Sequence, residues 1–441
     1  MNITNNFKKG VIKETLSLLP KISDKNIIKA TYLLEKVAPK AAKDKIKFVR
    51  KLYQENHPVL TLTKRALTDI DKNCQKKFLE NFIFTGLLEN QKKREKAEKE
   101  GLPPLFTLLI SPSMRCNLNC KGCYAKNYKK EDDLPFEILD RVIQEAKKIG
   151  VAFFTILGGE PFIREDIFDI FKKHSDAYFQ VYTNGTLIND KLAKKIKEVG
   201  NVLLEISIEG FENETDYRRG EGTFKKVIKA MDILKENHIP FGYSVCVTRK
   251  NAETVVSDKF IDFLIEKGAL IGWYFLYMPV CGDKNTDLMP TPEQRNNQRI
   301  RRDYIRNNKP IFIIDFWNDA PYVGGCIASK YYAHITNFGD VEPCIFTHFA
   351  QVNIKNTSLK EALNCQFFKE IRKRQPYSPN LLMPCMLIDH PHIIRELHKI
   401  CDIYPTHPKA TTLVEDLKDE IDKYSLEVHK IYDKIWEEQQ K

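Results

Sequence analysis

Residues 105–128 read LFTLLISPSMRCNLNCKGCYAKNY and join an apolar, strand-like run to a polar loop that carries three cysteines. Cys116, Cys120 and Cys123 have the spacing C-x3-C-x2-C. Three thiolates on one loop can hold one metal cluster, and three ligands instead of four leave one iron open to a cofactor or substrate. A zinc site would usually have a fourth Cys or His nearby. The other alternative, three unrelated cysteines of the hydrophobic core, does not fit a polar loop that contains glycine.

The apolar run before the cysteines is the first of six β-rich runs. The others lie at 152–157, 178–183, 202–208, 241–247 and 271–277, and amphipathic helical patterns fill the gaps between them. This alternation predicts an α/β fold with a parallel sheet and right-handed crossovers. Six strands correspond to a partial (βα)6 barrel of the TIM type, whose active site lies at the carboxyl ends of the strands.

The cysteine motif, the strand count and the motifs that follow resemble radical S-adenosylmethionine (radical SAM) enzymes over about residues 105–280. The resemblance implies a 4Fe-4S cluster on the three cysteines, with S-adenosylmethionine bound at the open iron. An electron from the cluster, supplied by a donor such as flavodoxin or ferredoxin, then cleaves a carbon–sulfur bond. The resulting 5′-deoxyadenosyl radical abstracts hydrogen from a substrate, while the protein orients the reactants and keeps the site dry.

The second strand-like run ends in GGEP, residues 158–161. Two glycines allow backbone conformations and close approaches that other residues forbid, so a ligand could lie against this backbone. A tight turn with a solvated Glu is the alternative. In the radical SAM family this segment contacts the amino group of the methionine moiety, and the resemblance gives that role to Gly158, Gly159 and Glu160.

Polar residues at the ends of the third and fourth runs point to the barrel mouth. Matching positions in the family contact the ribose and the carboxylate of the cofactor, and here they are Thr183, Asn184, Ser207 and Glu209. Arg219 resembles the family arginine that pairs with the methionine carboxylate, and Arg218 is an equal candidate. Tyr124 is expected near the adenine, although Gly122 stands where the family often has an aromatic residue. The pattern assigns no further catalytic residue.

A second cysteine pattern, C-x12-G-x4-C, runs from Cys326 to Cys344 and resembles the opening of a SPASM or twitch extension. In such extensions a β-hairpin presents cysteines to an auxiliary iron–sulfur cluster, and YYAHIT–NFGD–VEPC fits a hairpin. The full downstream cysteine pattern is missing. Cys385 is the best third ligand, and the fourth could be substrate, Cys281, Cys365, Cys401, His390 or Asp389. The alternative is a lid without metal.

The charged residues are distributed unevenly along the chain. Residues 1–100 contain 23 Lys and Arg against 12 Asp and Glu, which accounts for the whole net charge of +11. This basic helical region includes an apolar stripe at 80–90, and together they fit either a surface packed on the barrel or peripheral contact with an anionic membrane. Nucleic acid is a weaker candidate, because no aromatic ladder or known motif accompanies the charge.

The remaining composition is that of a globular protein. Of 441 residues 42% are hydrophobic, and the eleven cysteines are an odd number without an export signal, so metal or redox use is favoured over disulfides. We expect a cytoplasmic protein with no signal peptide or transmembrane helix. Four parts are expected: a basic helical region at 1–100, a radical SAM core at 101–281, a SPASM-like region at 282–400 and a C-terminal helix at 401–441.

Two classes of function follow from these patterns. The first is a radical SAM enzyme that acts on a small molecule, on a membrane lipid or, as a maturase, on a peptide. The second is a non-enzymatic iron–sulfur or zinc protein with a regulatory role. GGEP and the polar strand ends favour the enzyme, because a metal sensor has no need of an amino-acid-binding edge. Neither the fold nor the extension identifies the substrate.

Overall fold

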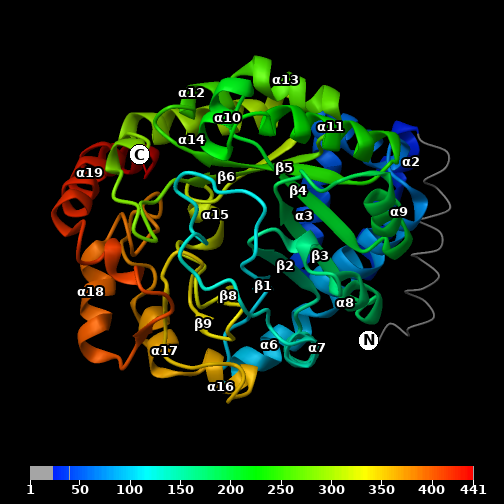
Figure 1. Ribbon diagram of the computed structural model, residues 1–441. Coiled ribbons are helices and arrows are strands. Elements are labelled where there is room, and N and C mark those ends of the chain that lie inside the picture. The colour runs from blue at the N-terminus through cyan, green and yellow to red at the C-terminus, as the bar shows by residue number, and fades with distance from the viewer. Residues whose placement is uncertain (1–22, 39, 441) are drawn as a thin grey trace.

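The computed structural model describes residues 23–38 and 40–440. Its main feature is a curved sheet in the order β7-β6-β5-β4-β3-β2-β1-β8-β9 (Figure 1). Neighbours from β7 to β8 pair in parallel, and β8 pairs with β9 in antiparallel fashion. The strands are β1 Thr107–Ser113, β2 Phe153–Gly158, β3 Tyr178–Thr183, β4 Val202–Ser207, β5 Phe241–Val247, β6 Ile271–Leu276, β7 Phe312–Asp315, β8 Tyr332–Ile335 and β9 Val341–Glu342.

The first six strands coincide with the six predicted runs, so the predicted partial barrel is confirmed. The connecting helices are α7 Phe136–Lys148, α8 Ile167–Lys173, α9 Asp190–Val199, α10 Glu212–Arg219, α11 Thr223–Glu236, α12 Ala252–Val255 and α13 Asp258–Lys267. Helix α9 illustrates the local signals. The Asn189 side chain caps its first turn, and Gly200 ends it with φ of +69°, a left-handed conformation that glycine adopts at little cost.

Strand side chains alternate between the helical layer and the barrel interior. Those facing the helices, such as Ile156, Val181 and Leu204, are fully buried in the main hydrophobic core. By contrast, Ser207, Cys246, Trp273 and Phe275 point inward and remain only partly buried. These inward-facing side chains therefore keep some exposure within the barrel at this level.

The C-terminal half extends the sheet on both sides. After η3 Thr286–Leu288 and α14 Pro292–Asn308, β7 adds a seventh parallel strand beside β6. The predicted hairpin forms as β8 and β9, and β8 joins the other side of the barrel by pairing with β1. The remaining elements are α15 Ala320–Val323, β10 Phe349–Ala350, α16 Leu359–Leu363, α17 Gln366–Arg374, α18 Pro391–Ile400, β11 Tyr404–Pro405, η4 Ala410–Thr412 and α19 Lys418–Gln440.

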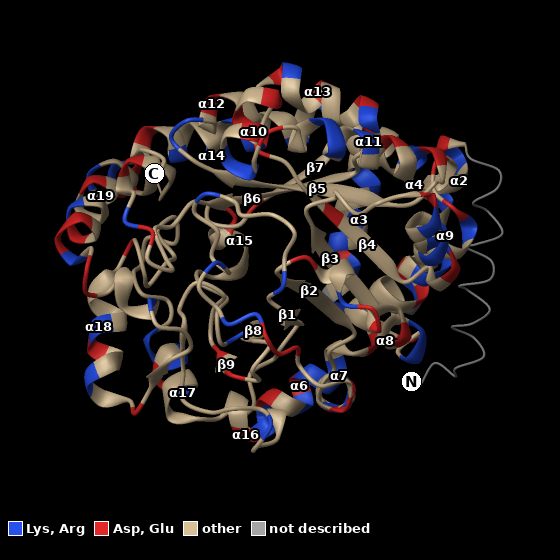
Figure 2. Ribbon diagram, viewed as in Figure 1, with Lys and Arg blue, Asp and Glu red and all other residues tan. Residues whose placement is uncertain are grey.

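The described part of the basic N-terminal region is helical, as predicted, while residues 1–22 lie outside the described residues. Its elements are α2 Asp24–Val37, α3 Lys40–Gln54, α4 Pro58–Thr68, α5 Lys72–Lys77, the π-helical η1 Phe78–Glu89 and α6 Gln91–Lys99. Lys and Arg are distributed over these helices and over the barrel helices, with Asp and Glu interspersed (Figure 2).

The apolar stripe at 80–90 belongs to η1 and packs on the barrel. The Phe82 ring lies 5.1 Å from the Phe153 ring and 6.4 Å from the Phe106 ring, measured between centroids. The buried Asn81 amide donates to the carbonyls of Ser175 and Ala177, both at 2.9 Å. These residues flank the amino ends of the strands, so η1 covers the end of the barrel opposite the predicted site.

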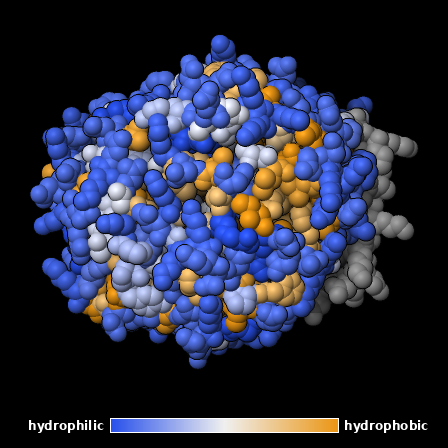
Figure 3. Space-filling model, in the orientation of Figure 1, coloured by the Kyte–Doolittle hydropathy of each residue, from blue (hydrophilic) through white to orange (hydrophobic). Residues whose placement is uncertain are grey.

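None of the helices in the described ranges combines the length and the apolar character that crossing a membrane requires. The face viewed in Figure 3 has apolar residues gathered near its centre, within a largely hydrophilic surround. The loop that follows β1 runs across the middle of this same face in Figure 1.

Candidate active site

The loop between β1 and α7 carries the three cysteines of the C-x3-C-x2-C motif. Burial raises the pKa of the Cys116 and Cys123 thiols, and each is raised further by neighbouring cysteines of the motif. All three cysteines lie on this loop, which begins at the carboxyl end of β1, and three thiolates on one loop can serve as ligands to one cluster.

The GGEP segment packs tightly against the beginning of this loop. Gly158 has φ of +109°, and a Cβ atom there would collide with the carbonyl oxygen of Ser113. The amide of Gly159 donates to the Ser113 carbonyl at 3.0 Å, and that of Glu160 donates to the Arg115 carbonyl at 2.8 Å. In this structure both glycines are required by the close approach of two backbone segments, which sets the position of the cysteine loop.

Glu160 is fully buried, and its carboxylate faces the protein. It accepts hydrogen bonds from the Thr183 hydroxyl at 2.8 Å, from the Asn184 amide nitrogen at 2.8 Å and from the Phe162 amide nitrogen at 3.2 Å. Burial raises its pKa to about 7, although these donors oppose the shift. The side chain therefore ties the end of β2 to the end of β3.

Asn184 connects this strand end to the cysteine loop. Its side-chain amide donates to Asn117 Oδ1 at 2.8 Å and lies 3.8 Å from the Cys116 sulfur. Its own Oδ1 accepts from the Thr186 amide at 2.9 Å. Asn184 is thus placed to orient a cluster ligand.

Two arginines share one carboxylate beside the cysteines. Arg218 Nη1 lies 2.7 Å from Glu209 Oε1, and Arg219 Nη2 lies 2.6 Å from the same oxygen. Glu209 Oε2 accepts from the Cys246 amide at 3.0 Å. Arg218 also contacts the Gly122 carbonyl at 3.4 Å, while its buried Nε has no hydrogen-bond partner among the described residues. Arg218, with this free donor, is therefore a better candidate than Arg219 to bind an anionic ligand.

The other predicted contact residues lie around the same mouth. The Ser207 hydroxyl is 3.3 Å from the Ser244 hydroxyl on β5. The Tyr124 hydroxyl accepts from the Gly158 amide at 3.0 Å, which holds the ring against the GGEP segment. Three thiols on one loop, inward-facing side chains that are only partly buried and an unpartnered guanidinium nitrogen together fit a cluster with an amino-acid cofactor beside it.

The C-terminal cysteines form a second group. Burial is the main cause that raises the pKa of Cys326, to about 12, and Cys344 adds to this rise. Burial likewise raises the pKa of Cys385, with contributions from Cys326 and Cys344. The Tyr332 hydroxyl donates to the Cys344 sulfur at 3.0 Å. Cys326 and Cys344 thus belong to the electrostatic surroundings of Cys385, and the role of the three as ligands to an auxiliary cluster stays a prediction.

The candidates for a fourth ligand lie in different surroundings. Asp389 is next to this group, since its Oδ2 accepts from the Cys385 amide at 3.0 Å, but it also forms a fully buried ion pair with Arg295 at 2.8 Å. His390 Nε2 is 2.9 Å from the Met383 carbonyl oxygen. Cys401 contributes to the raised pKa of Cys365, whereas Cys281 Sγ lies 3.2 Å from His407 Nε2.

A buried polar network between the hairpin and the cysteine loop was not predicted. His334 on β8 lies 2.7 Å from the Ser111 hydroxyl and 2.6 Å from Glu342 Oε2. Glu342 Oε1 accepts from the Tyr128 hydroxyl at 2.7 Å. Period-2 alternation in YYAHIT places His334 on the inward face with Tyr332, a signal available in the sequence, but no local pattern connects residues 128 and 342.

Comparison with known proteins agrees with this geometry. Residues 110–258 match the model of the radical SAM superfamily, and residues 326–386 match the SPASM iron–sulfur cluster-binding domain. The AdoMet-dependent heme synthase of Methanosarcina barkeri is 24% identical over 287 residues, 58% of this chain and 82% of that protein. The cysteine-type anaerobic sulfatase-maturating enzyme of Clostridium perfringens is 28% identical over 254 residues, 52% and 65% of the two chains.

Solved structures share the fold. Streptococcus suis SuiB bound to S-adenosylmethionine matches with a TM-score of 0.56 and 21% identity over 67% of this chain and 76% of that chain. The same protein bound to its precursor peptide SuiA matches with a TM-score of 0.55 and 18% identity, over 70% and 82%. The two domains imply a 4Fe-4S cluster, S-adenosylmethionine and auxiliary iron–sulfur clusters as cofactors. The chain is an enzyme of the radical SAM superfamily and carries a SPASM domain.

Proposed function

We propose that this enzyme modifies a peptide by removing hydrogen from an apolar or aromatic side chain. The observation that carries the proposal is an aromatic wall inside the barrel. The Phe275 ring lies 6.0 Å from the Trp273 ring, 5.9 Å from the Tyr182 ring and 5.5 Å from the Phe316 ring. Trp273 and Phe275 are only partly buried, so part of the wall is available to a ligand.

The charge of the inward-facing side chains favours this class of substrate. Ser207, Ser244 and Cys246 are neutral, and burial raises the pKa of Glu205 well above its usual value, so that its protonated form is favoured. Arg218 and Arg219, the last two residues of α10, both pair with Glu209, and Arg218 Nε, a buried donor without a partner among the described residues, is the atom we assign to the methionine carboxylate. A tetrapyrrole carries several carboxylates that need cationic partners. An apolar side chain of a peptide can bind by packing against the aromatic rings alone.

A membrane lipid is the less supported substrate. Its main basis in the sequence was the stripe at 80–90 beside the basic charge, and Asn81 and Phe82 of this stripe contact the barrel. The likeness to SuiB, whose structure was solved with a precursor peptide, and to a sulfatase-maturating enzyme also supports a peptide. The electron donor, in our proposal, is a flavodoxin or ferredoxin.

The chain's own residues would act by binding and orientation. Cys116, Cys120 and Cys123 would hold the cluster, and Arg218 Nε would meet the methionine carboxylate. Glu160 and Asn184 would hold the ends of β2 and β3 in position against the cysteine loop, so that S-adenosylmethionine can bind there. When bound, the cluster and S-adenosylmethionine supply the hydrogen-abstracting chemistry.

The proposal is tested with short peptides encoded beside the gene, synthesised with deuterated aliphatic and aromatic residues. Reconstituted protein is incubated anaerobically with S-adenosylmethionine, dithionite and each peptide. We expect deuterium in 5′-deoxyadenosine and a mass change in one peptide. The Trp273→Ala variant should keep slow cleavage of S-adenosylmethionine but lose peptide modification, and the triple Cys116, Cys120 and Cys123→Ala variant should lose both. Deuterium transfer from a lipid or a tetrapyrrole, with none from any peptide, would contradict a peptide substrate.

A further inference from the structure

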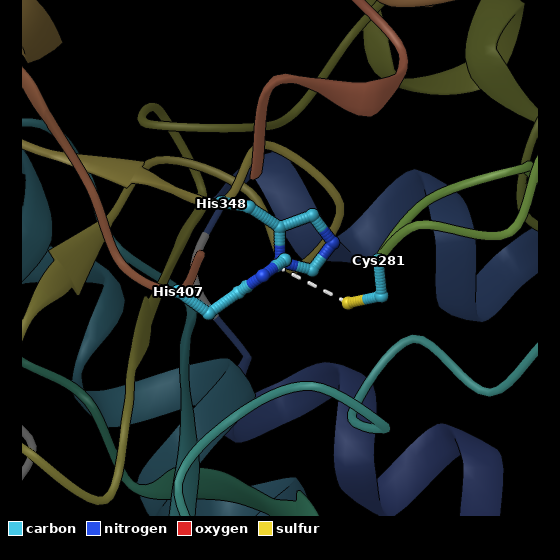
Figure 4. Close-up of side chains that lie close together, drawn as sticks. All are labelled: Cys281, His348 and His407. Carbon is cyan, nitrogen blue, oxygen red and sulfur yellow. Dashed lines mark hydrogen bonds between the residues drawn. The ribbon is translucent and has the colours of Figure 1, made fainter. Parts of the chain in front are cut away.

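Three side chains from distant parts of the sequence meet beside the cysteine loop without belonging to either cysteine group. Cys281 follows β6, His348 precedes β10 and His407 follows β11 (Figure 4). One ligand atom from each lies within 4.8 Å of the others, and their exposed fractions are 3%, 1% and 5%. Cys281 Sγ lies 3.2 Å from His407 Nε2.

Two of the three residues have a backbone conformation that side chains disfavour. Cys281 has φ of +56° and His348 has φ of +58°. Non-glycine residues adopt the left-handed region rarely, and such strain persists where the surrounding structure enforces it, often at functional sites. Here the strained backbone turns both side chains toward one buried point.

Both histidines have the neutral charge that metal binding needs. Burial lowers the pKa of His407 to about 4 and that of His348 well below its usual value, so both imidazoles are neutral. His348 Nδ1 lies 2.7 Å from the Tyr128 hydroxyl, which in turn donates to Glu342. His348 Nε2 is buried and has no partner among the described residues. A ring nitrogen oriented by a polar chain, with the other nitrogen free, is typical of a metal ligand.

We propose that Cys281 Sγ, His348 Nε2 and His407 Nε2 bind a divalent transition-metal ion of the zinc class. Sulfur and nitrogen donors suit such an ion, and tetrahedral bonds of about 2.0–2.3 Å place ligand atoms roughly 3.5 Å apart. The Cys281–His407 distance already meets this requirement, and the remaining separations, at up to 4.8 Å, need a contraction of about 1 Å. A fourth position is left for water.

Loading the site requires two proton movements. His407 Nδ1 accepts from the Lys409 amide at 3.1 Å, so the metal-free ring carries its proton on Nε2, facing Cys281. On binding, the Cys281 thiol releases its proton to solvent and the imidazole proton moves to Nδ1, so that the ion gains one thiolate and two neutral imidazoles. The Lys409 amide loses one hydrogen bond, a small cost beside three metal–ligand bonds.

The ion would hold distant segments of the chain together. The Cys281 thiol donates to the Tyr124 carbonyl at 2.6 Å, and Tyr124 directly follows Cys123. Tyr128, also on the cysteine loop, contacts His348. The site would therefore join the end of β6 and the segments around β10 and β11 to the loop that holds the first cluster. This inference does not depend on which substrate the enzyme takes.

The test uses iron–sulfur-replete protein, so that both cysteine groups are occupied. The protein is incubated anaerobically with one equivalent of Zn²⁺ and desalted, and zinc and iron are then measured together. We expect about one zinc per chain, with one sulfur and two imidazole nitrogens in its X-ray absorption spectrum. Cys281→Ser, His348→Gln and His407→Gln should lower zinc at least fivefold with iron unchanged. Cys74→Ser, at a buried cysteine of α5, is the matched control and should retain zinc.

Several results would overturn the inference, and the first two need no variant. The wild-type protein could hold no zinc, or its zinc could have three or four sulfur neighbours, which would place it in a cysteine group. Zinc retained at full occupancy by the Cys281→Ser variant would also overturn it. A loss of about four irons from that variant would instead make Cys281 a cluster ligand.

Discussion

Glu160 shows how a residue in a binding motif can act through its neighbours. The resemblance to the radical SAM family assigns it to the amino group of S-adenosylmethionine, and that role stays a prediction. In the structure its carboxylate accepts hydrogen bonds from Thr183, Asn184 and Phe162. A fully buried carboxyl with a raised pKa is costly to ionise, so its charge state is linked to the stability of the fold.

This linkage predicts a pH dependence. The pKa of Glu160 rises from 4.5 to about 7 on folding, so its contribution to stability is complete below pH 4.5 and is lost as the pH rises through 7. At 1.36 kcal/mol per pKa unit the loss is about 3 kcal/mol. Glu160→Gln cannot ionise, so its unfolding free energy should fall less between pH 5 and 7.5 than that of the wild type. Denaturant titrations at both pH values measure the difference, and parallel pH profiles would contradict it.

Arg218 and Arg219 are adjacent but are not equivalent. Only Arg218 has an unpartnered buried Nε, and it also reaches the Gly122 carbonyl within the cysteine motif. Hydrogen bonds to charged groups contribute about 1.5–3 kcal/mol. We therefore expect Arg218→Ala to weaken S-adenosylmethionine binding about 10- to 100-fold in equilibrium dialysis, with iron content unchanged.

Two variants control this prediction. Arg218→Lys should recover part of the affinity, because it restores the charge but not the planar set of donors. Arg219→Ala should have the smaller effect, since Arg218 still neutralises Glu209. A larger loss of affinity in Arg219→Ala than in Arg218→Ala would reverse the assignment.

At the scale of elements, the N-terminal helices are part of the barrel's support. Phe78 of η1 contacts the Tyr178 ring at 5.5 Å, and Phe82 contacts Phe153 at 5.1 Å. Arg65 of α4 donates to the carbonyls of Ile265 and Ala269, both at 3.0 Å. These contacts reach β2, β3 and the loop before β6, so the region fastens several barrel strands at their amino ends.

The docked helices predict the outcome of a truncation. A chain starting at Gly101 should unfold at a lower temperature than the full chain, because it exposes the rings of Phe153 and Tyr178 and loses the Arg65 hydrogen bonds to the carbonyls of Ile265 and Ala269. Phe82→Ala should show part of this loss, about 2–4 kcal/mol for a partly buried ring. Thermal and denaturant unfolding measure both changes.

The same two chains distinguish support from membrane docking. If the region only supports the barrel, full-length protein should not float with anionic liposomes at low salt. Flotation that is lost with residues 1–100 and with rising salt would restore the membrane hypothesis. Unchanged thermal stability after truncation would show that these contacts contribute little.

For the whole molecule, the C-terminal region extends the barrel sheet at both edges and carries a SPASM domain with a second group of cysteines. β8 pairs with β1 from Thr107 to Ile110, and the His334–Glu342–Tyr128 network connects the hairpin to the cysteine loop. The cysteine loop after β1 and the hairpin that carries Cys344 at its end are therefore joined to neighbouring strands of the same sheet.

Two separate groups predict separable iron contents. At about four irons per cluster, reconstituted wild-type protein should hold roughly eight irons. Replacing Cys116, Cys120 and Cys123 by Ala should leave about four and abolish cleavage of S-adenosylmethionine, and replacing Cys326, Cys344 and Cys385 should also leave about four. Iron and sulfide analysis measures the contents. Wild-type protein that saturates at about four irons would make the C-terminal group a lid without a cluster.

The sequence alone determined the features that local patterns encode. Six apolar runs alternating with amphipathic helices were sufficient for the partial barrel, because each strand and helix carries its own periodicity. Short spacings indicated the radical SAM and SPASM domains, since C-x3-C-x2-C and C-x12-G-x4-C each lie within one loop or hairpin, whereas the ligand roles of the cysteines stay predictions. β7 was missed because its four residues lie in a region rich in Pro, Gly and Cys.

Only the tertiary structure decided which distant residues meet. Nothing local to residues 80–90 distinguishes an apolar face that packs on Phe153 from one that enters a membrane. The meeting of Cys281, His348 and His407 depends on three connections that cross much of the chain. Such contacts arise from the packing of whole elements, and sequence spacing carries no information about them when the intervening chain is long and folded.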